Sequence, residues 1–309
     1  MDKNLRNAFQ MVVENYNRKE EVAEMSEGVK DGLQAEELPF IEQYCKVKPK
    51  ATILDVGCGA GREAFALHKM GFNVAGIDVA GNMIREAKRN ARNSGTKIDF
   101  KIGDGIQLPF ESHSFDYVLM LNRVLEHIPK KESRIKALQE VRRVLKPRGI
   151  AIINAMNSSL LSEYFFTLYS FVMPFCERER WQHELKETEK SALRYYFGRY
   201  VKGIVWNSLV VPVNSLKNLK RRILMAVLKE QYNSLEPGDT FYERKGQGNS
   251  GTIFFHRHTI KEVLDAIARS ELMLKEYKSR FELTGNPFGK KFLRKLEIMH
   301  YYTVQKPML

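Results

Sequence analysis

Cysteine is scarce in this sequence, because the 309 residues include only three, at Cys45, Cys58 and Cys176. The three have no CxxC spacing and no neighbouring pair of histidines, which argues against both a zinc site and a disulfide framework. We therefore expect reduced thiols and no bound metal. Proline and glycine are also few, at 10 and 20 residues, while 43% of the chain is hydrophobic. This composition excludes collagen-like and disordered chains and is typical of globular proteins.

Export and membrane-spanning signals are missing as well. The chain begins Met1-Asp2-Lys3-Asn4, with no apolar run followed by a small-residue cleavage site, so a cytoplasmic location is expected. An aromatic stretch at Leu160–Cys176 contains Glu163 and Pro174 and falls short of the ~20 uncharged residues that a spanning helix needs. Two interpretations of this stretch stay open, a buried lid helix and an interfacial helix that touches lipid.

Charge is unevenly distributed along the chain, whose net charge is +13. The first 45 residues carry five Lys or Arg against ten Asp or Glu, so the rest is strongly basic. A basic body attracts anionic partners such as RNA, acidic membranes or acidic metabolites, and selects none of them. Between residues 216 and 227, Leu, Ile and Val recur at helical spacing, and Lys and Arg stand between them. That pattern fits an ordinary amphipathic helix or one that lies peripherally on anionic lipid.

Apolar periodicity divides the chain into four parts. We expect an N-terminal helical segment at 1–45, an α/β core at 46–157, an inserted helical lid at 158–258, and a C-terminal completion of the core at 259–309. Short apolar runs that alternate with helical stretches indicate a doubly wound, mostly parallel, seven-stranded α/β sheet. The expected strands are 52–56, 73–78, 97–102, 115–121, 150–154, 272–277 and 298–304, with helices near 82–92, 133–145 and 260–268 and a turn at 146–149. The turn-rich stretch 236–251 suits either a gate over the substrate or an exposed connector.

A glycine-rich turn directly follows the first expected strand, at Gly57-Cys58-Gly59-Ala60-Gly61. Glycines at such a turn let a ligand approach backbone N–H groups at a helix N-terminus. Asp78 ends the second strand, where a carboxylate can accept both hydroxyls of a ribose. Arg62 stands where a dinucleotide site prefers glycine or alanine, which makes NAD the weaker alternative. Asp55, at the end of a buried strand, needs a cationic partner.

These residues resemble the class I S-adenosylmethionine-dependent methyltransferases, of the type similar to small-molecule and quinone methylases. The resemblance covers 53–153, about a third of the chain. Its motifs here are Leu54-Asp55-Val56-Gly57-Cys58-Gly59-Ala60-Gly61, Gly76-Ile77-Asp78, Gly103-Asp104-Gly105, Ser114-Phe115-Asp116-Tyr117-Val118, Leu125-Glu126-His127-Ile128 and Arg143-Val144-Leu145-Lys146-Pro147. Arg148 departs from the pattern, because a glycine is commoner there.

The resemblance implies S-adenosylmethionine as the cofactor. Its sulfonium or ammonium group would be the cation that Asp55 needs. By position, the family pattern assigns the methionine half to Gly57, Gly59, Gly61 and Asn122, the ribose to Asp78, the flanks of the adenine to Val79 and Met83, and the adenine edge to Asp104 and Gly105. Asp104 alone would also fit a turn-forming Asx residue, and Met83 ordinary core packing.

Methyl transfer from a sulfonium is an in-line displacement, to which the protein contributes mainly positioning in a dry pocket. A general base is needed only if the acceptor must lose a proton. His127 is the first candidate, and His256 and His258 are two more; each fits a packing or hydrogen-bonding role equally well. Tyr242 and Arg257 are further open candidates for substrate contact.

The sequence therefore predicts a methyltransferase that acts on a small or lipid-like metabolite. A tRNA- or RNA-modifying methyltransferase is the alternative, although the chain has no aromatic RNP motif, GXXG clamp or zinc knuckle. A second alternative is an NAD-binding or non-catalytic regulatory protein with the same fold. The substrate, the accepting atom and the oligomeric state are not indicated.

Overall fold

The computed structural model describes residues 3–46, 50–156, 236, 238–246, 249–283 and 299–308. All of them belong to one compact unit, made of residues 1–158, 236–295 and 299–309. The two segments considered for membrane contact, 160–176 and 216–227, lie outside the described residues. Of the helices that the structure describes, none is long and apolar enough to cross a membrane.

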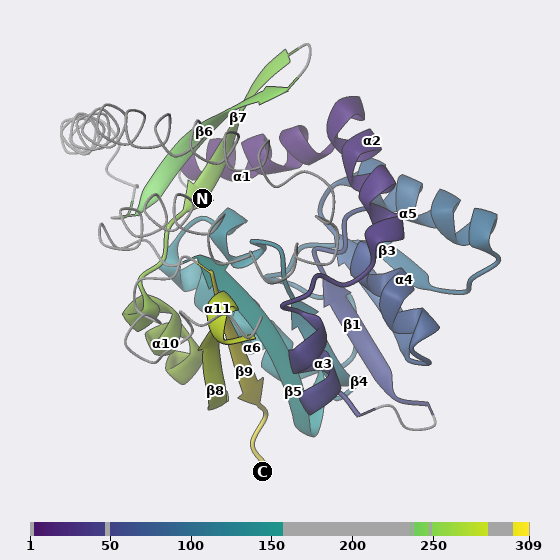
Figure 1. The fold of residues 1–309 in the computed structure, drawn as a ribbon. Coiled ribbons are helices and arrows are strands. Elements are labelled where there is room, and N and C mark those ends of the chain that lie inside the picture. The colour runs from purple at the N-terminus through teal and green to yellow at the C-terminus, as the bar shows by residue number, and fades with distance from the viewer. Residues whose placement is uncertain are drawn as a thin grey trace, which may run out of the picture. The chain divides into compact units, whose positions relative to one another are not determined.

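A seven-stranded sheet forms the centre of this unit (Figure 1). Its strands are β1 (Thr52–Val56), β2 (Asn73–Asp78), β3 (Asp99–Ile102), β4 (Phe115–Met120), β5 (Leu145–Met156), β8 (Met273–Ser279) and β9 (Met299–Gln305). Their spatial order is β3-β2-β1-β4-β5-β9-β8, and β9 runs antiparallel to both of its neighbours. The predicted doubly wound, mostly parallel sheet is therefore confirmed.

Helices cover both faces of the sheet. Successive residues of a buried strand point to opposite faces, so each strand packs against helices on both sides. In β1, Ile53 packs in the same apolar cluster as residues of α3 (Leu38–Tyr44), α4 (Arg62–Lys69) and α5 (Gly81–Ser94). The next residue, Leu54, packs in the cluster that contains residues of α6 (Lys131–Val144) and α10 (Ile260–Arg269). Both side chains are fully buried. The strand ends that carry the glycine turn are thereby held between two packed layers.

One boundary in the sheet differs from its expected place. The sequence predicts a turn at 146–149 and a strand from 150, but β5 begins at Leu145, directly after α6. Leu145 pairs with Phe115, and the register then shifts so that Ile150 faces Tyr117. The extra residues between these pairs form a bulge in which Arg148 has a φ of +64°. A left-handed backbone explains why glycine is favoured at this position.

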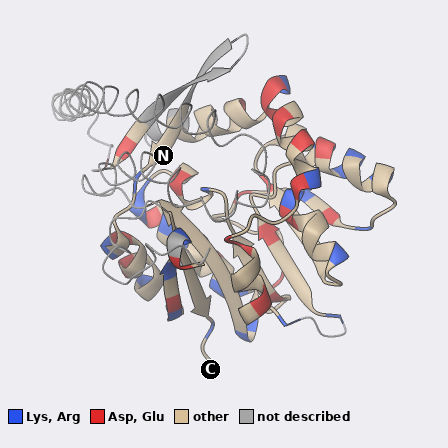
Figure 2. Ribbon diagram, in the orientation of Figure 1, with Lys and Arg blue, Asp and Glu red and all other residues tan. Residues whose placement is uncertain are grey.

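The N-terminal segment contains the short helices that its apolar spacing predicts. These are α1 (Lys3–Tyr16), α2 (Lys19–Glu27), the 3-10 turn η1 (Gly28–Asp31) and α3. Acidic residues gather along the ribbon of α2 (Figure 2), which carries Glu20, Glu21, Glu24 and Glu27. The negative charge of the first 45 residues is thus concentrated in part on one helix.

A β-hairpin occupies the end of the stretch that the sequence assigns to a helical lid. Its strands, β6 (Asp239–Gly246) and β7 (Asn249–His256), pair antiparallel, from Asp239 with His256 to Gly246 with Asn249. Ile253 and Phe254 of β7 pack against Ala8 and Val12 of α1. Ile253 and Phe254 are therefore buried in a strand because α1 gives them a surface to cover. The earlier part of the expected lid, 158–235, lies outside the described residues.

Candidate active site

The glycine turn after β1 is held by the neighbouring strand end. The N–H groups of Gly57 and Cys58 both donate to the carbonyl of Ile77, at 2.8 and 2.9 Å. Gly59 has a φ of +51° and open space where a Cβ would stand, so the backbone is accessible there. Gly61, with a φ of +99°, serves another purpose, because a Cβ would come within 2.8 Å of Phe65. The turn is thus open on one side and tightly packed on the other.

Asp78 joins this turn to the end of β2. Its Oδ2 accepts a hydrogen bond from the N–H of Gly59 at 3.0 Å, and its Oδ1 accepts one from the N–H of Ala80 at 2.8 Å. Burial raises the pKa of Asp78, while these backbone N–H groups act in the opposite direction. The carboxylate is consequently fixed at the strand end, where the family pattern places the ribose.

Asp55 is 2% exposed, and its Oδ2 has no hydrogen-bond partner among the described residues. Burial first, and the nearby Glu63 second, raise the pKa of this carboxyl well above its ordinary value. A bound cation would stabilise the charged form of both acids. Asp55 does not line the cavity over the strand ends, so its carboxyl acts on a bound cation only through the negative charge that it adds beneath the glycine turn.

Arg62 connects the glycine turn to the N-terminal segment. Its guanidinium donates to Glu37 Oε1 at 2.8 Å and to the carbonyl of Gly32 at 2.5 Å. It also bonds Glu63, which accepts a second hydrogen bond from Asn122. Burial raises the pKa of Glu63 to about 7. Sequence reasoning used Arg62 only to argue against NAD and missed both glutamates, because no local pattern identifies the partner of an arginine.

A cavity of about 1200 Å³ lies over these strand ends. It exceeds the roughly 300–1,000 Å³ of a typical small-ligand site, so it has room for two molecules. Of the residues singled out from the sequence, the cavity wall includes Gly57, Gly59, Asp78, Val79, Met83, Asp104, Gly105, Asn122, His127 and Arg257. Asp55, Gly61, His256 and His258 do not line this cavity. Tyr242 lies in β6, and its side chain is outside what the structure describes.

Two side chains on the wall satisfy both of the interpretations left open by the sequence. Asp104 Oδ1 accepts a hydrogen bond from the N–H of Ile106 at 3.1 Å, which is the turn-forming role. Met83 is fully buried, which is the packing role. Because both residues also line the cavity, the structural role and contact with a ligand are compatible at each position.

His127 follows β4, in the 3-10 turn η2 (Leu125–His127), and faces a residue that sequence reasoning missed. Its Nε2 lies 2.9 Å from the hydroxyl of Tyr16 on α1, and its Nδ1 lies 3.0 Å from the carbonyl of Phe254 on β7. A carbonyl only accepts, so Nδ1 carries the proton and Nε2 accepts the Tyr16 hydroxyl. Tyr16 and His127 both line the cavity.

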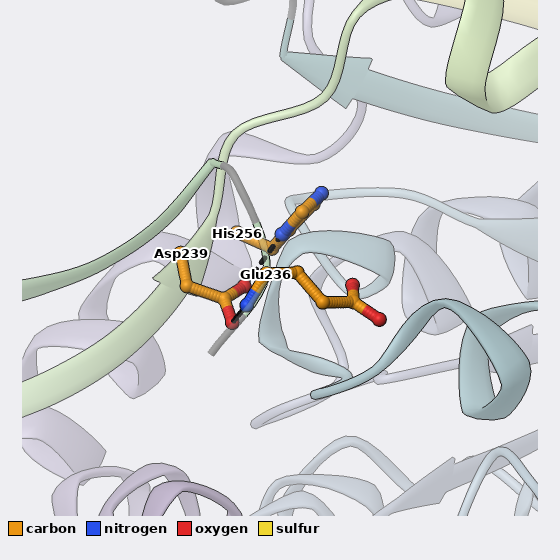
Figure 3. Close-up of side chains that lie close together, drawn as sticks. All are labelled: Glu236, Asp239 and His256. Atoms are coloured by element: carbon orange, nitrogen blue, oxygen red, sulfur yellow. Dashed lines mark hydrogen bonds and ion pairs between the residues drawn. The ribbon is translucent and has the colours of Figure 1, made fainter. Parts of the chain in front are cut away.

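Glu236, Asp239 and His256 bring possible metal-ligand atoms within 4.8 Å of one another. Figure 3 shows the three side chains close together, at the base of the hairpin. Each carboxylate oxygen already accepts a hydrogen bond. Glu236 accepts from the N–H of Lys131 at 2.7 Å and from Arg134 at 2.5 Å. Asp239 accepts from His256 Nδ1 at 2.6 Å and from the N–H of Glu236 at 2.8 Å. This cluster therefore connects the base of the hairpin to the start of α6.

His258 lies beside His256, with ring centroids 4.7 Å apart. Burial, and then the neighbouring His256, lower the pKa of His258 well below its ordinary value. Both rings are almost completely buried, and neither lines the cavity over the strand ends. The packing interpretation of these two histidines therefore fits their position better than contact with a substrate.

Several known proteins are similar to this chain over part of its length. Residues 53–149 match a family model described as a methyltransferase domain. An uncharacterised protein of Methanocaldococcus jannaschii is 34% identical over 137 residues, which are 44% of this chain and 55% of that protein. A ubiquinone biosynthesis O-methyltransferase of Actinobacillus pleuropneumoniae is 32% identical over 128 residues, or 40% of this chain and 53% of that enzyme. The chain thus spans about half the length of these two curated relatives.

A probable tRNA methyltransferase 9B of Mus musculus is 31% identical over 122 residues, which are 39% of this chain and 25% of that protein. Among solved structures, a SAM-dependent methyltransferase from Methanosarcina mazei aligns with a TM-score of 0.53. That alignment has 20% identity and covers 90% of this chain and 100% of the other, so it supports the fold. The matched residues, the strand order and the glycine turn together identify a class I S-adenosylmethionine-dependent methyltransferase domain in this chain.

Proposed function

We propose that this chain transfers a methyl group from S-adenosylmethionine to a small or lipid-like metabolite held in the same cavity. The observation that carries the proposal is a single cavity of about 1200 Å³ that includes both the strand ends after β1–β4 and the Tyr16–His127 pair. The first part has the features of a cofactor site, and the second has a group that can accept a proton. Small acceptors are also what the name of the ubiquinone O-methyltransferase relative indicates.

The strand-end part of the cavity suits a cationic nucleoside cofactor. Gly59 leaves its backbone accessible, Asp78 presents a fixed carboxylate, and Asp104 lies at the end of the neighbouring strand β3. Asp55 and Glu63 add buried acid groups near the turn. The cofactor supplies an activated methyl group on a sulfonium. The protein holds that group and keeps bulk water away from it.

The other part of the cavity suits the acceptor. If the acceptor is a hydroxyl or an amine, its bond to the methyl carbon forms as the sulfur–methyl bond breaks, and its proton must leave. His127 Nε2 takes up that proton through the hydroxyl of Tyr16, which already donates to it. The carbonyl of Phe254 keeps His127 in the tautomer that this step requires.

The test supplies S-adenosylmethionine with a tritiated methyl group to the full chain and an extract of its host cells. The products are then separated into soluble, lipid, RNA and protein fractions. We expect label in the soluble or the lipid fraction. Label found only in RNA would instead support the tRNA-modifying alternative and contradict the proposed substrate class.

A pair of matched variants controls this experiment. Asp78→Ala removes a carboxylate from the cavity wall and is expected to abolish labelling. Asp99→Ala removes an exposed carboxylate on β3 that pairs with Lys101 outside the cavity wall and is expected to leave labelling intact. Equal labelling by the two variants would rule out a cofactor site at the end of β2.

A further inference from the structure

The backbone around the 3-10 turn η2 is strained. Asn122, Arg123 and Lys130 are non-glycine residues with φ values of +55°, +69° and +66°, in the left-handed region that such residues rarely adopt. Strained backbone persists where the surrounding groups over-determine it, and it is often found at functional sites. Because His127 lies between these positions, its place opposite Tyr16 depends on what holds the turn.

Two carbonyls of this turn, one on each side of His127, accept hydrogen bonds from buried side chains. Arg134 of α6 donates to the carbonyl of Ile128 at 3.1 Å. His258, which follows β7, donates to the carbonyl of Leu125. The donor is Nδ1, because Nε2 of His258 has no partner among the described residues. Arg134 and His258 are 5% and 2% exposed, so water does not compete for the two bonds.

A chain of contacts joins the two donors. Arg134 donates to Glu236 at 2.5 Å, and Asp239 accepts the N–H of Glu236 at 2.8 Å. Asp239 also accepts a hydrogen bond from His256 Nδ1 at 2.6 Å, as Figure 3 shows. The ring of His256 lies against that of His258, with centroids 4.7 Å apart. These five residues, which we call the buried polar cluster, therefore connect the two carbonyls on either side of His127.

Hydrogen-bond donors already use the acids of the buried polar cluster. The carboxylate of Glu236 accepts from Arg134 and from the N–H of Lys131, so a metal ion would have to displace them. Nε2 of His256 and of His258 is buried without a partner, which is a cost. Apolar side chains of similar volume are often as stable as a buried ion pair, but hydrogen bonds fix a geometry. The cluster is thus better explained by the position that it imposes than by stability.

The end of the hairpin also contacts His127 directly. The carbonyl of Phe254, two residues before His256, accepts a hydrogen bond from Nδ1 of His127 at 3.0 Å. His256 and His258 therefore hold the same segment that holds the ring of His127. A shift of this segment would disturb the ring and the carbonyl of Leu125 together.

We propose that the buried polar cluster positions His127 for proton transfer. The cluster fixes the turn on both sides of His127 and the hairpin carbonyl that bonds Nδ1, so Nε2 stays directed at Tyr16. Its members are positioning residues rather than catalytic ones, because none of the five lines the cavity. The inference rests on the proposed function, in which His127 takes up the proton of the acceptor.

His258 offers a matched pair of variants. The amide N–H of His258→Asn lies close to the place of Nδ1, whereas that of His258→Gln lies near the place of Nε2 and cannot reach the carbonyl of Leu125 in the same way. Arg134→Lys keeps the charge but replaces a planar fork, which bonds Glu236 and Ile128, with a single ammonium group. His68→Gln, on α4 and outside both the cavity wall and the cluster, is the control.

The first readout is the nuclear magnetic resonance of the ring nitrogens of His127. The full chain is labelled with nitrogen-15 histidine and saturated with S-adenosylhomocysteine, the demethylated cofactor, and His127→Gln identifies the signals. We expect the Nδ1–H tautomer alone in the native protein, in His258→Asn and in His68→Gln. His258→Gln and Arg134→Lys should each give a mixture of the two tautomers. The native tautomer alone in both of these variants would overturn the inference.

The second readout is the rate of tritium transfer to the host-cell extract. The rate should fall about tenfold in His258→Gln and stay within about threefold of the native rate in His258→Asn, as one hydrogen bond allows. The Kd for S-adenosylhomocysteine should stay the same in both variants. A structural role alone would give no rescue by asparagine, so equal rates in the two variants would also overturn the inference.

The two readouts separate this inference from the proposed function. If His127→Gln slowed transfer but no cluster variant changed the tautomer, the proposed function would stand and the positioning role would be refuted. If the tautomer depended on His258 while His127→Gln transferred methyl groups at the native rate, the proposed proton transfer would be wrong although the cluster fixes the ring.

Discussion

The two halves of the cavity wall are built in different ways. The cofactor half comes from the ends of strands β1 to β4 and the residues that follow them, within 56–122, and its acidic residues Asp78 and Asp104 stand at or just after apolar strands. The acceptor half combines α1, η2 and β7, and its central hydrogen bond joins residues 111 positions apart, Tyr16 and His127. A local pattern can therefore describe the first half, whereas the second exists only after distant segments have packed together. Two of the predictions below act on one half of the cavity, and two act on buried charges of the fold.

The largest expected effect is on stability, in the link between the N-terminal segment and the glycine turn. Arg62→Ala leaves the buried carboxylate of Glu37 without its partner, so the free energy of unfolding should fall by about 3 kcal/mol. Urea denaturation measures this loss. Arg89→Ala, which breaks a pair whose arginine is mostly exposed, should change the stability by less than about 1 kcal/mol. If both variants lost the same free energy of unfolding, Arg62 would not be what holds the N-terminal segment to the glycine turn.

The next effect is on cofactor affinity. Asp78→Ala removes a carboxylate that can accept two hydrogen bonds from a ribose, so the Kd for S-adenosylhomocysteine should rise about a hundredfold. Calorimetry measures the change, with Asp99→Ala as the control that stays at the native value. If Asp78→Ala also weakened the binding of an acceptor by the same factor, in a sample saturated with the cofactor product, the two halves would be coupled rather than separate.

A smaller effect is expected from the acceptor half. Tyr16→Phe removes the hydroxyl that donates to His127 and should lower the rate of methyl transfer about tenfold, while the Kd for S-adenosylhomocysteine stays the same. The tritium assay measures the rate, and His127→Gln, which removes the group that takes up the proton, should lower it at least as much. A rise in the cofactor Kd without a loss of rate would place Tyr16 in the cofactor half.

The smallest predicted effect is a pH dependence of stability. Glu126 is 0% exposed, and burial raises its pKa to about 7 from an ordinary 4.5. The folded protein therefore retains a proton that the unfolded chain loses, so this contribution to stability is full below about pH 4.5 and is lost as the pH rises through 7. Between pH 6 and 8 the loss amounts to about 1 kcal/mol.

Glu126→Gln has no proton to lose. Its free energy of unfolding, measured by urea denaturation, should therefore change by about 1 kcal/mol less between pH 6 and pH 8 than that of the native protein. Part of the residual dependence should come from Glu63 in the cofactor half, whose pKa is also raised to about 7. If the variant kept the native pH dependence, Glu126 would be charged in the folded protein at both values.

Local sequence patterns predict much of the fold. The strands after Pro49 begin and end within two residues of their expected places up to β4, because each is an apolar run bounded by glycine or polar residues. The start of β5 was wrong, since the bulge that contains Arg148 depends on pairing with Phe115 rather than on the residues of the bulge themselves. The hairpin was missed for a similar reason, because its strand β7 packs against α1.

Taken by itself, the sequence determined that Asp78, Asp104 and the glycine turn would meet, because parallel strands place their carboxyl ends along one edge of a sheet. Only the tertiary structure decided what stands opposite that edge. It placed Tyr16 on His127, paired Arg62 with Glu37, and directed Arg257 rather than His256 into the cavity. Contacts of this kind depend on how distant segments pack and on which face of a strand is covered, and spacing along the chain encodes neither.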